Sequence, residues 1–220
     1  MTTMKRKIFV VDDHPVMRWG YISLINMEPD LEVCGEAGSA PEALERIGMS
    51  RPDLVIADIS LDGMNGIDLT KHLQALYPDL PVLIVSMHDE ALYGERALRA
   101  GARGYVMKRE VRTRIVEAIR RILHGAFYLS DQMSTKILLQ YQGKHLDETR
   151  SSIEQLSDRE MEVFELFGRG YSTREIAEAL MISPKTVESH RNRIKEKLAI
   201  DSTAELLQRA VQWAQSENVL

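Results

Sequence analysis

The chain has 220 residues, of which 44% are hydrophobic and 28% are charged, a composition typical of a globular protein with room for two small domains. Its net charge of -5 argues against indiscriminate nucleic-acid binding, so any contact with DNA has to come from a local basic patch. No apolar stretch approaches the roughly 20 residues that span a bilayer, and the N-terminus has no secretory pattern. We therefore expect a cytoplasmic protein with no membrane partner.

The segment 1–125 alternates strand and helix patterns five times. Short apolar runs predict buried strands at 8–11, 31–37, 54–57, 82–85 and 105–107. Helical patterns follow them near 16–27, 41–48, 66–77, 90–100 and 111–124. This alternation predicts an α/β domain, with a doubly wound five-stranded parallel sheet that helices cover on both faces.

Beyond residue 125 the pattern changes. One further helix near 130–141 and the polar stretch 142–152 are predicted to form a linker, 126–152. The segment 153–220 is helical throughout in pattern, with four helices near 158–168, 173–180, 184–198 and 203–216. We expect an all-α four-helix domain that contains a helix-turn-helix.

Helix starts in both segments carry clear signals. Capping boxes are predicted from the pairs Ser39 and Glu42, Ser157 and Glu160, and Ser172 and Glu175. Ser183 followed by Pro184 predicts a cap and a first-turn proline. These signals support the predicted order of helices.

Polar side chains follow four of the predicted strands. Asp12 and Asp13, then Asp58, Ser86 and Lys108 stand at these positions. Because a parallel sheet collects its reactive groups at the carboxyl ends of its strands, we expect all five to converge. Three carboxylates this close raise one another's pKa unless a cation offsets them, and Mg²⁺ is the cation that prefers oxygen ligands. Metal and ammonium together would neutralise a phosphoryl group transferred to a carboxylate.

These residues lie in four motifs: VVDDHP at 10–15, IADISLDGMNG at 56–66, VSMHDE at 85–90 and GYVMK at 104–108. In this order and spacing, they make the segment resemble the CheY-like receiver domain of two-component response regulators. The resemblance implies that Asp58 accepts a phosphoryl group from a histidine kinase. It also implies a Mg²⁺ site formed by Asp12, Asp13, Asp58 and the main-chain carbonyl of Ser60.

The same resemblance implies a switch. Lys108 would contact the acyl phosphate, Ser86 would turn its hydroxyl to a phosphate oxygen, and Tyr105 would rotate inward. The added charge of about -1.5 to -2 can bias such a two-state element. Asp62 and Arg109 stand where many receivers have proline, and these departures bear on loop geometry.

The alternatives for these residues are structural. Aspartates at loop starts are often helix caps, and Tyr105 could have a packing role only. His14 and His88 flank the site, and we interpret them as surface or tuning residues because Mg²⁺ prefers oxygen ligands.

The helix predicted at 184–198 carries five basic and two acidic side chains. Val187, Ile194 and Leu198 share one face, expected to pack on the preceding helix, and the opposite face is basic and hydrogen-bonding, as the DNA major groove requires. LSDREMEVFELFGRGYSTREIAEAL and ISPKTVESHRNRIKEKL make residues 156–200 resemble the LuxR-type helix-turn-helix of NarL/FixJ response regulators. By position in that motif, the expected base readers are Glu188, Ser189 and Asn192. The expected phosphate contacts are Lys185, Thr186, Arg191, Arg193 and Lys195.

The resemblances imply a phosphorylation-activated transcriptional regulator rather than an enzyme. We expect the receiver to mask the recognition helix until Asp58 is modified, after which a homodimer binds double-stranded DNA. One alternative is an aspartate-nucleophile phosphohydrolase, which would need an acidic residue where this chain has Ser60. The other is a regulator that binds a protein instead of DNA, for which Glu188 on the reading face leaves room.

Overall fold

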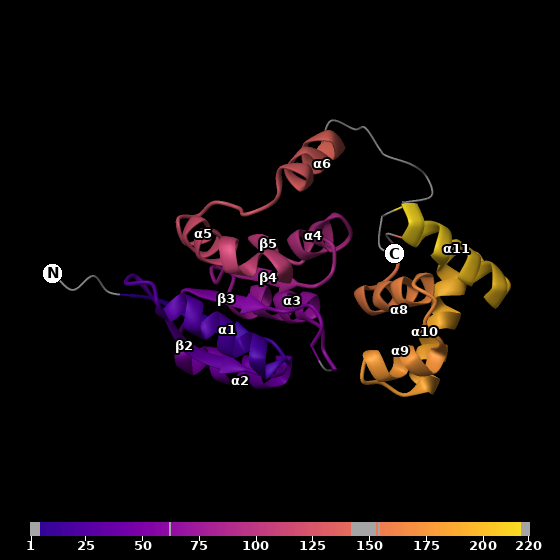
Figure 1. Cartoon of the computed structure of the whole chain (residues 1–220), viewed down its shortest axis with the longest axis horizontal. Coiled ribbons are helices and arrows are strands. Elements are labelled where there is room, and N and C mark those ends of the chain that lie inside the picture. Colours follow the sequence, from indigo (N-terminus) through magenta and orange to yellow (C-terminus); the bar gives the residue numbers. More distant parts are fainter. Residues whose placement is uncertain (1–4, 62, 142–152, 154, 217–220) are drawn as a thin grey trace. The chain divides into compact units, whose positions relative to one another are not determined.

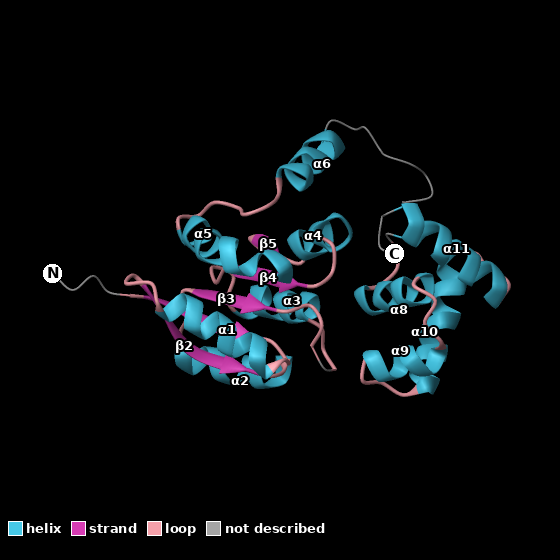
Figure 2. Ribbon diagram, in the orientation of Figure 1, coloured by secondary structure: helices cyan, strands magenta, loops and turns pink. Residues whose placement is uncertain are grey.

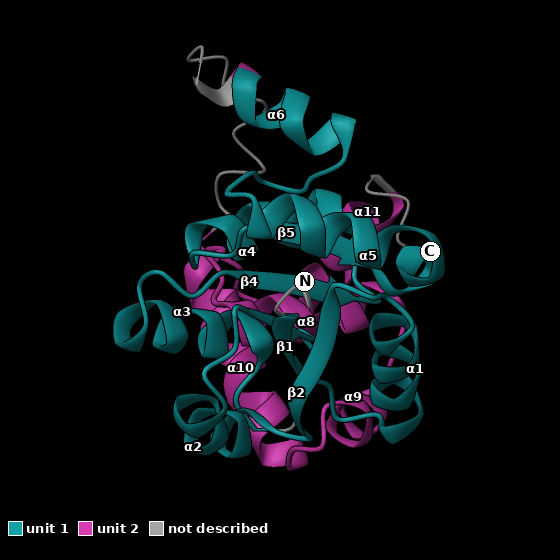
Figure 3. Cartoon of the chain, turned by 90° about the vertical axis from the view of Figure 1, so that its left-hand side faces the viewer, with its two compact units in different colours: residues 1–138 teal, residues 139–220 magenta. Residues whose placement is uncertain are grey.

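The computed structural model of the chain describes residues 5–61, 63–141, 153 and 155–216 (Figures 1 and 2). The predicted polar linker, 142–152, lies outside these residues, and so does Asp62. The chain divides into two compact units, Met1–Leu138 and Leu139–Leu220 (Figure 3). Within the described ranges, no helix combines the length and the apolar character needed to cross a membrane.

The first unit contains a five-stranded parallel sheet with the strand order β2-β1-β3-β4-β5. Its strands are β1 (Arg6–Val11), β2 (Leu31–Ala37), β3 (Leu54–Ala57), β4 (Val82–Ser86) and β5 (Gly104–Met107). Every residue of β3 and β4 is buried, because helices cover both faces of the sheet. This confirms the predicted doubly wound architecture and places β5 at one edge.

Four helices connect the strands, a fifth follows β5, and together the five form two layers (Figure 3). They are α1 (Pro15–Asn26), α2 (Ala40–Ser50), α3 (Gly66–Leu76), α4 (Glu90–Arg99) and α5 (Val111–Leu123). Tyr21 and Ile25 of α1 share one apolar core with Ile115 and Ile119 of α5, while α2, α3 and α4 lie on the other face. This layering leaves the carboxyl ends of the strands free for polar loops.

One further element follows β5, and another follows α5. A 3-10 turn, η1 (Lys108–Glu110), precedes α5, and the predicted linker helix is present as α6 (Asp131–Tyr141). Residues up to Leu138 cluster with the first unit, although we predict a linker from 126 onward. The reason is that Tyr128 bonds to the edge of the sheet and that Ser130 and Lys136 bond to α4, contacts that the sequence pattern does not reveal.

The second unit contains α8 (Asp158–Gly168), α9 (Thr173–Ala179), α10 (Pro184–Lys197) and α11 (Thr203–Ser216), as predicted. Each of its helices buries apolar side chains, although α8 also buries acidic ones, and Phe164 of α8 meets Trp213 of α11 with ring centroids 5.5 Å apart. Each helix start of α8 and α9 is a complete capping box, and Ser183 caps α10 before a first-turn proline.

The predicted capping box of α2 is only half formed. Ser39 accepts from the Glu42 main-chain N–H, but the Glu42 carboxylate accepts from the N–H of Gly38 instead of Ser39. The helix still begins where the pattern indicates, because one side-chain cap satisfies part of its free first turn.

Candidate functional site

The polar residues that follow β1, β3 and β5 meet at one edge of the sheet. Lys108 places its Nζ atom 2.6 Å from Asp58 Oδ2 and 2.8 Å from Asp12 Oδ2. Ligand atoms of Asp12, Asp13, His14 and Asp58 lie within 4.8 Å of one another. The structure thus brings together the three aspartates and the lysine that we predict to converge, and it adds His14 to them.

This cluster sets three carboxylates against one ammonium in a nearly dry environment. Asp58 is 2% exposed, and burial raises its pKa to about 6, although the Lys108 ammonium acts in the opposite direction. Burial alone would lower the pKa of Lys108, but the Asp58 and Asp12 carboxylates raise it above its ordinary value. The lysine is therefore charged at neutral pH, and the remaining negative charge favours a second cation.

Two carboxylate oxygens of the cluster, Asp13 Oδ1 and Asp58 Oδ1, are buried without a hydrogen-bond partner among the described residues. His14 Nδ1 lies 2.6 Å from Asp13 Oδ1, but this contact lacks hydrogen-bond geometry. Buried polar atoms are rarely left without a partner. Asp13 Oδ1 is open to a cation such as Mg²⁺, which takes oxygen ligands at partly hydrated sites, and Asp58 Oδ1 is open to an atom of an incoming group. The donor set therefore fits Mg²⁺.

Three residues outside the predicted set also shape the site. The buried Tyr21 hydroxyl donates to Asp12 Oδ2 over 3.3 Å, and Arg18 Nη1 donates to the Asp12 carbonyl over 2.6 Å. At Gly66, the first residue of α3, a Cβ atom would lie 1.9 Å from the Asp58 carbonyl oxygen. No local signal marks Tyr21 or Arg18, whereas a glycine at this helix start could have indicated a close backbone approach.

The loop after β4 joins the predicted switch residues. The Ser86 hydroxyl accepts from the His88 main-chain N–H over 3.2 Å, and the Tyr105 hydroxyl donates to the His88 carbonyl over 2.8 Å. His88 Nε2 lies 3.1 Å from the Ser60 hydroxyl, and its ring centroid is 4.5 Å from that of Tyr93. We interpret His88 from the sequence as a surface or tuning residue. In the structure it contacts Ser86, Tyr105, Ser60 and Tyr93.

Tyr105 points inward in this structure. The residue is 3% exposed, and burial raises the pKa of its hydroxyl well above the ordinary value. The inward position that we predict for the phosphorylated state is therefore already one that the folded chain adopts.

In the second unit, α10 has the two faces that its sequence predicts. Val187, Ile194 and Leu198 are buried on its inner side. Ile176 and Ala177 of α9 are buried as well, and α9 and α10 pack against each other. One side of α10 is thus fixed in the core, which holds the other side in a set direction.

The outer side of α10 carries the expected DNA contacts. All three expected base readers are exposed, namely Glu188, Ser189 and Asn192. The five expected phosphate contacts are exposed or half-buried, namely Lys185, Thr186, Arg191, Arg193 and Lys195. The Ser189 hydroxyl donates to the Lys185 carbonyl over 3.0 Å, so the helix itself already engages it. In the described part of the chain, the Asn192 amide has no such partner and is free to bind a base edge.

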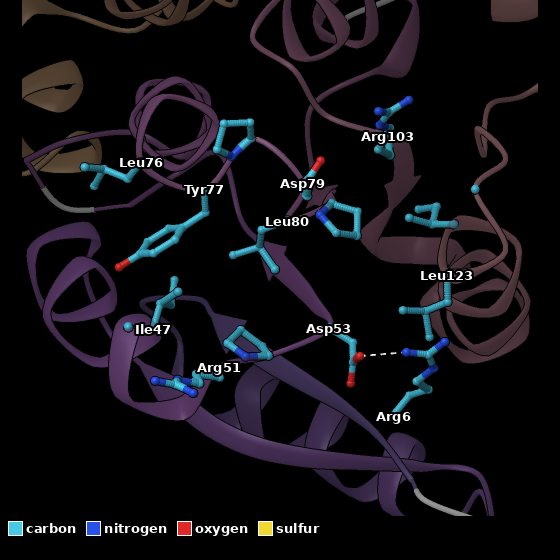
Figure 4. Close-up of a pocket in the computed structure, with 16 residues that line it drawn as sticks. Arg6, Ile47, Arg51, Asp53, Leu76, Tyr77, Asp79, Leu80, Arg103 and Leu123 are labelled. Carbon is cyan, nitrogen blue, oxygen red and sulfur yellow. Dashed lines mark hydrogen bonds and ion pairs between the residues drawn. The ribbon is translucent and has the colours of Figure 1, made fainter.

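A separate pocket of about 960 Å³ lies at the amino ends of the strands, away from the aspartate cluster (Figure 4). Arg6, Arg51 and Arg103 stand at separate corners of it, and Arg6 is paired with Asp53 at 2.8 Å. None of the predicted site residues lines this pocket. Its cations do not converge on one point, so it has no arrangement for binding an anion.

Comparison with protein families finds one match in each unit. Residues 8–120 match the response regulator receiver domain, and residues 154–210 match the bacterial regulatory proteins of the luxR family. The chain is 34% identical over 209 residues to the oxygen regulatory protein NreC of Staphylococcus carnosus, a match that covers 93% of this chain and 96% of NreC.

Solved structures agree with these matches. A LuxR-family two-component response regulator from Aurantimonas sp. SI85-9A1 is 35% identical, with a TM-score of 0.58 over 62% of this chain and 98% of that chain. RcsB from Salmonella enterica serovar Typhimurium, bound to promoter rprA, is 22% identical, with a TM-score of 0.61 over 94% of this chain and 98% of that chain. At that identity the second likeness supports the fold alone.

Both domain matches, the full-length relatives and the folds of the two units agree. The chain belongs to the NarL/FixJ-type response regulators, transcription factors in which a phosphorylated receiver domain regulates a luxR-family DNA-binding domain.

Proposed function

We propose that Asp58 is the phosphoacceptor of this response regulator and that a histidine kinase is its donor. The supporting observation is the state of the two carboxylate oxygens: Lys108 holds Oδ2, while the buried Oδ1 has no partner among the described residues. One oxygen is therefore oriented and the other is available as a nucleophile. The Oδ1–P bond forms as the P–N bond of the phosphohistidine breaks, and the imidazole nitrogen keeps the electron pair.

Lys108 and the Mg²⁺ ligands then have distinct roles in this proposal. Asp12, Asp13, Asp58 and the Ser60 main-chain carbonyl would hold Mg²⁺, which supplies charge neutralisation to the phosphoryl oxygens when bound. Lys108 already donates a hydrogen bond to Asp58, and its ammonium would pair with a phosphoryl oxygen once the acyl phosphate forms.

The switch would act through the loop after β4. Ser86 would donate its hydroxyl to a phosphate oxygen while still accepting from His88, because a hydroxyl can donate and accept at once. Tyr105 would be held inward by the His88 carbonyl in the phosphorylated state. Phosphorylation would thus act on the hydrogen-bonded cluster that joins β4 to β5 by adding a bond from the Ser86 hydroxyl to the phosphate.

The C-terminal unit would bind double-stranded DNA through α10. Glu188, Ser189 and Asn192 would read base edges, and the basic residues around them would contact phosphates. Inverting a two-state equilibrium from 1:99 to 99:1 takes about 5.5 kcal/mol, more than one hydroxyl contact supplies. Formation of a homodimer after phosphorylation would provide the rest.

The test of this proposal combines mass spectrometry with DNA binding. With acetyl phosphate and Mg²⁺, the full chain should gain roughly 80 Da, one phosphoryl unit, and its affinity for a selected DNA site should rise. Asp58→Asn should lose both responses, whereas Asp79→Asn, at an exposed carboxylate away from the site, should retain them. Absence of the adduct, or a rise in DNA affinity in Asp58→Asn, would refute the phosphoacceptor role.

The same samples test the alternatives. A phosphohydrolase would release phosphate from monoesters in many turnovers, which we do not expect. A regulator that binds only protein would show the adduct but no salt-dependent, sequence-selective retention of DNA.

A further inference from the structure

The free edge of β5 is taken by the segment that follows α5. Tyr128 forms a parallel bridge with Gly104, in which the Tyr128 N–H donates to the Arg103 carbonyl and the Tyr105 N–H donates to the Tyr128 carbonyl, both over 3.0 Å. The Tyr128 side chain is buried in the same apolar core as Ile122. A sheet edge that would otherwise be exposed is therefore covered by the chain's own next segment.

Gly104 makes this close approach feasible. A Cβ atom there would lie 2.9 Å from the Tyr128 carbonyl oxygen and 2.9 Å from Ile122 Cδ1. Any side chain at this position would push the Tyr128 strand away from β5. The glycine is thus matched to the segment that crosses it.

Helix α6 continues the contact along α4, on the side of the unit that carries α4 and β5 (Figures 1 and 3). The Ser130 N–H donates to Glu90 Oε1 over 3.1 Å, and Lys136 Nζ donates to the Ala91 carbonyl over 3.0 Å. Met133 is 2% exposed and fills the space beside Gly94. Glu90 is itself buried, so its hydrogen bond to Ser130 forms in a region with little water.

The residues that anchor the segment belong to the switch or lie next to it. Tyr105 binds the segment with its main-chain N–H and the loop after β4 with its hydroxyl. Glu90 stands two residues after His88, whose N–H is bound to the Ser86 hydroxyl. The loop that holds Ser86 and His88 therefore leads directly into Glu90, which holds Ser130.

We propose that residues 126–136 form a latch that holds the start of the linker on β5 and α4 and that phosphorylation of Asp58 releases. The proposal rests on the proposed function of Asp58 and adds the route by which the signal leaves the receiver. Tyr105 would couple the switch to the linker, because it bonds both to the His88 carbonyl and to Tyr128. Glu90 would do so through the chain, because it follows the loop after β4, and a shift of that loop toward Asp58 would draw it away from Ser130. Release would expose the β5 edge and free the chain that leads to the DNA-binding unit.

Hydrogen exchange in the full chain, with and without acetyl phosphate and Mg²⁺, tests the latch. Three amides report its bonds, namely Tyr105, Tyr128 and Ser130. Phosphorylation should speed their exchange about tenfold or more, as local opening does. The Arg103 amide, which bonds to Val82 on the inner side of β5, should keep its rate and serves as the internal control.

Glu90→Ala should speed exchange at Ser130 about tenfold without any phosphodonor, since a hydrogen bond to a buried carboxylate is lost. Glu45→Ala, at an exposed glutamate of α2, is the matched control and should leave these rates unchanged.

The two proposals fail in different ways. An adduct at Asp58 and a rise in DNA affinity, with unchanged or slower exchange at the three latch amides, would overturn the latch and leave the phosphoacceptor role intact. Equal loosening of Arg103 would also overturn it, because the whole edge strand would then be opening. Absence of the adduct would instead refute the function on which the latch depends.

Discussion

The proposed phosphoacceptor site and the proposed reading face of α10 keep their charged groups in opposite environments. In the receiver, the side chains of Asp12, Asp58 and Lys108 are almost fully buried. Lys108 Nζ lies within 3 Å of a carboxylate oxygen of each aspartate. On α10, Lys185 and Arg193 are exposed, and the Asn192 amide has no partner in the described part of the chain.

The difference follows from what each surface has to do. A buried cluster strengthens each charge interaction and fixes its geometry, which transfer of a phosphoryl group requires. A reading face has to exchange water for base edges and phosphates, so its side chains stay solvated until DNA arrives. Substitutions should therefore have all-or-none effects in the first region and graded effects in the second.

The largest effect is expected from Lys108→Met. With the ammonium gone, two buried carboxylates face each other and the incoming phosphoryl group loses its fixed countercharge. We expect the initial rate of phosphorylation by acetyl phosphate to fall by about 100-fold, or about 2.7 kcal/mol of activation free energy. Lys7→Met, on the exposed start of β1, is the control. A rate within about threefold of the wild type would break the contrast between the two regions.

A smaller effect is expected from Asn192→Ala on the reading face. Loss of one bidentate base contact should remove about 1–3 kcal/mol of discrimination between the selected site and a scrambled site. Affinity for the scrambled site should hardly change. Competition binding with both sequences measures this, and an equal loss on both would remove Asn192 from the base readers.

A third prediction concerns an ion pair of the second unit in which only the acidic partner is buried, because Glu160 is 3% exposed and Lys197 is exposed. Glu160 accepts from Lys197 Nζ over 2.6 Å and from the Ser157 N–H over 2.7 Å. Burial alone would raise the pKa of Glu160, but Lys197 and Ser157 lower it below its ordinary value of 4.5. Its ionised form therefore stabilises the fold above about pH 4.5, and this contribution is lost as the pH falls through the lowered folded-state pKa.

Glu160→Gln should accordingly lower the free energy of unfolding by about 1 kcal/mol at pH 7. The gap to the wild type should close in acid, once Glu160 is protonated in both the folded and the unfolded chain. Chemical denaturation at several pH values measures it. A gap that widens as the pH falls would contradict the ion-pair interpretation.

The smallest effect is expected from Lys195→Ala. If Lys195 contacts one phosphate, its loss should weaken binding to all sequences alike and reduce the slope of log affinity against log salt by about 0.9. Titrations at three or more salt concentrations test this. A loss of affinity confined to one sequence would instead place Lys195 among the base readers and contradict its assignment as a phosphate contact.

Much of this molecule could be predicted because its signals are local. Apolar runs separated by helical segments indicate parallel strands, and the carboxyl ends of parallel strands meet at one edge of the sheet. The amino-acid sequence alone therefore places Asp12, Asp58 and Lys108 together. Likewise, Ser157 and Ser172 mark helix starts, because the cap and the amides that it satisfies are neighbours in the chain.

Only the tertiary structure decided which groups from distant segments touch. Three such features depend on packing between segments with no shared sequence pattern. Asp58 Oδ2 is paired while Oδ1 is not, Tyr21 bonds to Asp12, and Tyr128 covers the edge of β5. Sequence periodicity reports which face of an element is buried, whereas a hydrogen bond between two elements depends on their register and approach. For this reason the convergence of Asp12, Asp58 and Lys108 could be predicted from the sequence, and the contacts of residues 126–136 with β5 and α4 could not.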